Sequence, residues 1–455
     1  MSRHSIRALV AAWLAVAAPG CAGSMDVARF QTDVATGRYE QALGHLDDEP
    51  DEDVAALLDR ALLESALGRH AESNALFEAA EAEIDDLYTR SLTKEAVSML
   101  TGDLSLDYRP PGFERAFIPY YRAWNYLEMG DRSGALVEAR RIGERLDYES
   151  TTCSDEQGAC AHDAFLRYFS GLLFEWGGEA NDAYVSYKLA DEAAATARER
   201  YGVGSPPDLG PRLVRLAAAL GFGDEEEVWR ERYGVGAPPE TPRATVLVVL
   251  ENGVVGMRSE ASITLPIFKG ESDAIAGDVD AWSGKLARRR HAHHYEGVEV
   301  EYLLRLAVPA YVDRPPPASR GRFTLGTVSR TTDRVENLSA MAAAGLEHAM
   351  GGILARTAAR ALTKYLAKRA ADDKIGKGAG LVVNLLGAAT ERADTRSWRS
   401  LPHEIQMASL SVAPGTYAGK LEVLGPEGRV LTEVFYEAVE AKAGGVTFVR
   451  HRTGS

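Results

Sequence analysis

The chain has 455 residues, of which 45% are hydrophobic, and a formal net charge of −15. Residues 25–240 hold 43 acidic and 21 basic side chains, whereas residues 241–455 hold 23 acidic and 28 basic ones. Because nucleic-acid phosphates require a basic footprint, such an acidic half argues against nucleic acid as a partner. The length is sufficient for two domains with cores of their own.

The N-terminus is typical of a secretory signal. Arg3 and Arg7 precede an apolar run from Ala8 to Ala18, which is too short to cross a bilayer, so we expect a signal peptide over residues 1–20. The Cys that follows Gly20 resembles the lipobox of bacterial lipoproteins. This resemblance implies cleavage before Cys21, lipid on Cys21 and a place in the cell envelope. Ala rather than Asp at position 22 resembles the pattern that sorts lipoproteins to the outer membrane, where the protein would face the periplasm or the cell surface. Secretion without lipid is the alternative.

Residues 21–240 are predicted to form a helical domain, because the pattern is Ala-rich and almost free of β-branched runs. A Gly followed five positions later by a small residue recurs in it. Gly ends a helix in a left-handed turn, and the small residue lets the next helix approach closely. The copies, whose members we expect to pack the repeats, are Gly37 and Ala42, Gly68 and Ser73, Gly130 and Ala135, and Gly178 and Ala183.

This spacing, with the motif Tyr39-Glu-Gln-Ala42, resembles the tetratricopeptide-repeat family. The resemblance implies stacked helical hairpins in an α-solenoid whose concave face docks another envelope protein or a peptide. The alternative is a helical support that only positions the second half. Between two of the copies, Cys153 and Cys160 lie in a polar loop and predict a disulfide; a metal site with His162 is the less favoured reading.

Residues 241–455 are predicted to form a strand-rich domain. The pattern changes after Pro242 to short apolar runs bounded by turn residues, as in strands. We therefore expect an α+β chain of several domains, with a β-sandwich-like domain or a curled antiparallel sheet after the solenoid. The expected strands cover residues 244–250, 262–266, 298–308, 322–328, 404–412, 417–424, 430–436 and 446–450.

A helical hairpin is expected as an insertion at about 335–392. Four basic residues occur at every fourth position of its first helix (346–369), which predicts one line of positive charge. These candidate anion-binding residues are Arg356, Arg360, Lys364 and Lys368. Such a helix binds anionic lipid or polysaccharide or docks an acidic partner. The alternatives are a core helix with a solvated basic face and a helix paired with the acidic helical half of its own chain. The second helix, at 378–389, is more apolar and is expected to be buried.

The stretch from Ala393 to Glu404, continued by Ile405-Gln406, resembles a signature of uncharacterised bacterial lipoproteins that join a repeat-containing helical half to a strand-rich half. Glu251-Asn-Gly253 and the Pro-Gly-Thr-Tyr turn at 414–417 fit the same resemblance. It implies an architecture and an envelope location, and no established activity.

Motifs of known catalytic sites are lacking in the sequence. The one histidine cluster, His291, His293 and His294, follows three arginines that would oppose a cation, so a solvated loop is favoured over a metal-dependent hydrolase. We expect a non-enzyme without cofactor or metal. The favoured hypothesis is an envelope lipoprotein that docks protein partners through its solenoid and contacts the membrane through its N-terminal lipid.

Overall fold

The computed structural model describes residues 25–89, 107–152, 163–236, 243–268, 300–375 and 392–453. Several sequence predictions fall outside these residues and are not tested by it. They concern lipidation of Cys21, the disulfide between Cys153 and Cys160, the histidine cluster at 291–294 and the apolar helix at 378–389. The described residues form a mixed α/β structure, with helices before residue 236 and several sheets after residue 243.

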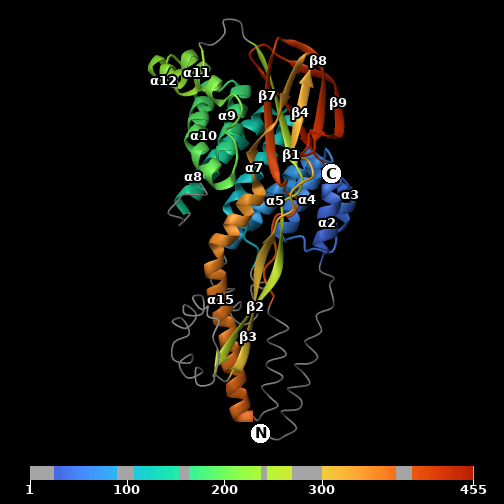
Figure 1. The fold of residues 1–455 in the computed structure, drawn as a ribbon, viewed down its shortest axis with the longest axis vertical. Coiled ribbons are helices and arrows are strands. Elements are labelled where there is room, and N and C mark those ends of the chain that lie inside the picture. The colour runs from blue at the N-terminus through green and yellow to red at the C-terminus, as the bar shows by residue number, and fades with distance from the viewer. Residues whose placement is uncertain are drawn as a thin grey trace.

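Consecutive helices pack in pairs along the N-terminal half (Figure 1). The four glycines of the repeated spacing have positive φ angles between 70° and 86°, and the four small residues paired with them have no exposed surface. The helices are α2 (Val27–Ala35), α3 (Tyr39–Gly44), α4 (Val54–Ala66), α5 (His70–Thr89), α7 (Gly112–Glu128), α8 (Arg132–Thr152), α9 (Ala164–Gly177), α10 (Ala180–Tyr201), α11 (Leu209–Leu220) and α12 (Gly223–Tyr233).

The first four-stranded sheet has the order β10-β1-β7-β6. Its strands are β1 (Ala244–Asn252), β6 (Asp333–Glu336), β7 (Glu404–Val412) and β10 (Val446–Arg452). A curled antiparallel sheet was one of the two expected forms, but this sheet is mixed, because β10 runs parallel to β1. The reason is topological: the chain passes through the second sheet before its last strand returns beside the first.

The second four-stranded sheet has the order β5-β4-β8-β9 and is antiparallel. Its strands are β4 (Arg320–Leu325), β5 (Val328–Thr331), β8 (Gly415–Leu424) and β9 (Val430–Ala441). Alternation along β1 explains how the layers stack, because neighbouring side chains of a strand point to opposite faces. Val246 and Val248 share a core with Phe323 of the second sheet, whereas Leu247 and Val249 share one with the helices. The first sheet is therefore the middle layer.

A long arm projects from this body (Figure 1). It consists of the hairpin of β2 (Met257–Phe268) and β3 (Val300–Val312) and of α15 (Leu338–Ile375), a helix of 38 residues. Leu304 and Leu306 of β3 pack against Leu362 and Tyr365 of α15. Residues 338–366 are long and apolar enough to cross a membrane, a test that core helices of soluble proteins also pass.

The prediction of one exposed line of four basic residues on this helix is wrong. Arg356 is exposed and Lys364 is half-buried, but Arg360 is only 1% exposed and lies 3.4 Å from the Thr357 hydroxyl. At 3.6 residues per turn, positions four apart drift around a helix by about 40° per step. The four positions therefore do not share one side, and Arg360, which directly precedes Ala361 and Leu362 of the core with β3, is buried. The side chain of Lys368 lies outside the described part of the helix.

Residues 393–403, called here the anchor segment, run between the helical half and the sheets. Trp398 is 1% exposed, and its ring lies 5.8 Å from that of Phe77 and 5.6 Å from that of Tyr121. Trp398, Leu401 and Phe448 belong to the same core as the helix residues, Phe448 at its margin. The two halves of the chain therefore fold around one shared core.

We expect Trp398→Ala to lower the free energy of unfolding by about 3–5 kcal/mol, because it empties a closed aromatic site. Helices and sheets should unfold in one transition, which urea unfolding followed by far-UV and near-UV circular dichroism will measure. Trp176→Ala, at the half-buried end of α9, is the matched control and should cost less. Separate transitions for helices and sheets would contradict a shared core.

Candidate functional site

Two buried carboxylates of the helical half hold the anchor segment. Asp59 of α4 accepts hydrogen bonds from Arg399 Nε at 2.6 Å and from the Ser400 backbone N–H at 2.8 Å. Glu114 of α7 accepts one from the Tyr108 hydroxyl at 2.5 Å and one from the Trp398 backbone N–H at 3.2 Å. These bonds fix the path of the segment as it approaches β7.

The end of the anchor segment connects three other parts of the chain. The Val255 N–H donates to the Leu401 carbonyl at 2.8 Å, and the His403 N–H donates to the Asn252 carbonyl at 3.0 Å. The Ser339 N–H at the start of α15 donates to the His403 carbonyl at 3.1 Å. His403 and Glu404 are thus held where the arm leaves the body.

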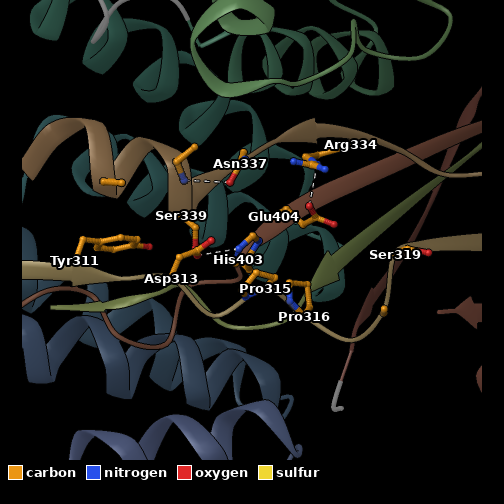
Figure 2. A pocket seen from close by; sticks show the side chains of 13 residues that line it. Tyr311, Asp313, Pro315, Pro316, Ser319, Arg334, Asn337, Ser339, His403 and Glu404 are labelled. Carbon is orange, nitrogen blue, oxygen red and sulfur yellow. Dashed lines mark hydrogen bonds and ion pairs between the residues drawn. The ribbon is translucent and has the colours of Figure 1, made fainter. Parts of the chain in front are cut away.

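A pocket of about 440 Å³ opens at this place (Figure 2). We call it the junction pocket. It is lined by the end of β3 and the loop after it, by β6, by the first turns of α15 and by the end of the anchor segment. The lining residues are Tyr311, Asp313, Pro315, Pro316, Ala318, Ser319, Arg334, Asn337, Ser339, Ala340, Ala343, His403 and Glu404.

The charged side chains of the junction pocket are arranged in pairs. Arg334 Nε lies 2.9 Å from Glu404 Oε2, and His403 Nε2 lies 3.1 Å from Asp313 Oδ1 (Figure 2). The Arg334 side chain is 44% exposed and that of Asp313 is 50% exposed, whereas that of Glu404 is 6% exposed. The Glu404 carboxylate is paired with Arg334, whereas the Asp313 side chain is half-exposed, so the accessible carboxylate of the pocket favours a cationic group.

The start of α15 does not add an anion site to this pocket, although helix N-termini often attract anions. The Ala340 N–H donates to Asn337 Oδ1 at 3.0 Å, and the Ser339 N–H is bonded to His403 as described above. Asn337 Nδ2 donates to the Tyr201 carbonyl at 3.2 Å. The donors that would meet an anion are therefore already bound within the chain.

Three further polar groups of the pocket are the His403 ring, the Ser339 hydroxyl and the Tyr311 hydroxyl. His403 directs Nε2 to Asp313, and its buried Nδ1 has no hydrogen-bond partner among the described residues. The Ser339 hydroxyl accepts from the Gly256 N–H at 3.1 Å. Burial raises the pKa of Tyr311 to about 12, so its hydroxyl stays protonated. Within the described residues, no group of His, Cys, Asp or Glu side chains could hold a metal ion.

Sequence reasoning did not identify the junction pocket. Asp313 and Arg334 belong to no motif, whereas His403 and Glu404 lie in the stretch 393–404 that carries the resemblance. The predicted site residues lie elsewhere: the repeat glycines are in the helix turns, and Arg356 and Lys364 are on α15 beyond the pocket lining. The two stretches singled out by resemblance, 251–253 and 393–404, do meet at the pocket wall. These two stretches were the feature of the sequence that could have indicated the pocket.

A pH-dependent contribution is expected from Glu114, because burial raises its pKa from 4.5 to about 7. Between these pH values the unfolded carboxyl has lost its proton while the folded one retains it. The unfolded state then binds fewer protons, so stability falls as pH rises through this window. Relative to Glu114→Gln, the wild-type free energy of unfolding should fall by on the order of 3 kcal/mol.

Urea unfolding at several pH values will measure this difference. Glu128→Gln, on the exposed end of the same helix, should leave the pH profile of the wild type unchanged. A profile of Glu114→Gln parallel to that of the wild type would show that Glu114 has an ordinary pKa.

Gly253 shapes the wall of the junction pocket. Its φ is +66°, and a Cβ at this position would lie 2.7 Å from Pro316 Cβ and 3.4 Å from His403 Cβ. Gly428, with φ +78° and no atom within 4 Å of such a Cβ, is a matched control. Gly428→Ala should cost about 1–2 kcal/mol from the backbone alone, and Gly253→Ala about 1–3 kcal/mol more from overpacking.

Chemical denaturation of both variants will test this prediction. An equal loss of stability in the two variants would mean that Pro316 and His403 move to make room for the added Cβ without loss of stability.

Comparison of the chain with protein-family models, with curated proteins and with solved structures finds no match.

Proposed function

We propose that the protein is an envelope lipoprotein, anchored at Cys21 in the outer membrane, that docks protein partners. In this proposal residues 21–240 are a tetratricopeptide-like solenoid and the two packed sheets are a sandwich-like body, as in the lipoproteins that the sequence resembles. The signal sequence supports the location. The shared core supports a scaffold, because it makes the helical half and the sheets one unit on which partners can be positioned.

The junction pocket is the observation that carries the docking function. Its Glu404 carboxylate is paired with Arg334, whereas the half-exposed carboxylate of Asp313 is accessible to a partner. A Lys or Arg side chain of a partner would form a charge-assisted hydrogen bond with Asp313. Its apolar stem would lie against Pro315 and Pro316, which line the same pocket. The ligand that fits is therefore a basic segment of another protein.

The inner face of the helical half is a less suitable docking surface than the sequence suggested. Trp124 lies 5.8 Å from the ring of Phe448, and Tyr121 lies 5.6 Å from that of Trp398. Both contacts come from the C-terminal half of the same chain. The aromatic face that a partner would need is thus occupied, which moves the proposed docking site to the junction pocket.

The membrane-surface alternative is weakened by the burial of Arg360, which leaves Arg356 and Lys364 as the accessible cations among the described side chains of the predicted line. The hydrolase alternative depends on residues 291–294, which lie outside the described part of the chain. Neither alternative gains an observation of its own.

A photo-crosslinking amino acid at Ala343, in the pocket lining, should capture a discrete protein partner in living cells. The same amino acid at Val185, 47% exposed on α10, is the control position. Adding Asp313→Lys should lower capture at Ala343 about tenfold, because it replaces an attraction by a like-charge contact.

Mass spectrometry of the adducts will identify the captured protein. Cys21→Ser should release the protein from the membrane fraction and lower capture of a membrane-bound partner. The junction pocket would be rejected as the docking site if the proteins captured at Ala343 are those captured at the Val185 control. Capture at Ala343 that Asp313→Lys leaves unchanged would reject it as well.

A further inference from the structure

A second surface, separate from the junction pocket, lies at the free edge of the second sheet. β9 is the last strand in the order β5-β4-β8-β9 and pairs with β8 on one side; within the described residues no strand pairs with its other side. Figure 1 shows β9 at the outer margin of this sheet. Irregular pairing flanks residues 432–436, which form the regular part of the edge. The backbone groups of such an edge are a template for an added strand.

Large apolar side chains are exposed on this edge strand. Phe435 is 69% exposed, the highest value among the exposed large hydrophobic residues of the described chain, and Val430 and Leu431 are 39% and 36% exposed. Val434 and Tyr436, which alternate with Phe435, pack against the core between the sheets. Phe435 therefore lies on the outer face by register, where an aromatic anchor is typical of a binding surface.

The charges of β9 indicate the kind of partner. Glu433, Glu437 and Glu440 are exposed on the strand, and the one charged residue opposite Phe435, Lys420, is bound to Glu422 at 3.0 Å and to Glu433 at 3.3 Å. An antiparallel second copy of β9 would bring glutamates against glutamates. An extended segment with Lys or Arg residues around an apolar one is complementary.

The sequence of β9 does not block an added strand. A proline has no backbone N–H to offer to a further strand, and β9 has no proline between Val430 and Ala441.

We propose that β9 is a docking strand, which binds a basic, extended segment of a partner protein by strand addition at residues 432–436 with Phe435 as its apolar anchor. The backbone of the segment would pair with the free edge, as in other complexes formed by strand addition. Its cations would face Glu433 and Glu437. Docking at β9 shares with the proposed function only the assumption of a protein partner. Because Asp313→Lys leaves β9 unchanged, either docking site can be disproved without the other.

The test uses a fluorescent peptide of alternating Lys and Val with a central Phe, and the mature chain in about 0.15 M salt, where distant charges are screened. A control peptide of the same sequence carries N-methyl groups at alternate residues, which removes backbone donors without changing charge. We expect fluorescence anisotropy to show saturable binding of the unmodified peptide to the protein. The N-methylated peptide should not bind. Phe435→Ala and Glu437→Lys should each weaken binding at least about fivefold.

Val228→Ala, 58% exposed on α12, is the control for loss of an exposed apolar side chain and should bind like the wild type. Equal binding of the two peptides would overturn strand addition. Unchanged binding by Phe435→Ala, or no binding at about 1 mM peptide, would overturn the site. A dimer in sedimentation that Phe435→Ala dissolves would instead assign the edge to a second copy.

Discussion

The buried ion pair of Asp59 and Arg399 connects the two halves of the molecule. The side chain of Asp59 is fully buried and that of Arg399 is 9% exposed. Burial raises the pKa of Asp59, which Arg399 and the Ser400 N–H counteract. Removing one partner of such a pair typically costs about 3–5 kcal/mol, because it leaves an uncompensated charge in the interior. Any other placement of the anchor segment would separate this pair and is therefore unfavourable.

The rest of the architecture follows from this attachment. With Trp398 packed edge-on against the stacked rings of Phe77 and Tyr121, the chain enters β7 at Glu404, and β7 pairs with β1 over its whole length. β1 is then enclosed between helices and the second sheet. The same attachment places His403 and Glu404 beside the first turns of α15, which forms the junction pocket and sets the direction of the arm. Docking at this pocket would act where the arm and the body meet.

Local features of this fold were predictable from the sequence. An apolar run followed by turn residues predicted the strand at 404–412, whose bounds the structure confirms. Gly178 was expected in a left-handed turn and has φ +86°. Features that depend on distant parts of the chain were not. Examples are the parallel pairing of β10 with β1, the burial of Arg360 and the grouping of Asp313, Arg334 and His403. Each depends on residues that no local pattern connects. The spacing of residues along a helix specifies which of them share a side of the helix. It does not specify which side other parts of the fold pack against.

Native-state hydrogen exchange tests most directly whether the anchor segment unites the two halves. The backbone N–H groups of Trp398 and Ser400 donate to Glu114 and Asp59, so both should exchange only when these contacts open. The account predicts that they open with the same free energy, and the same denaturant dependence, as the amides of α7 and β1. Exchange of residues 398–400 at a much lower opening free energy than both would contradict it.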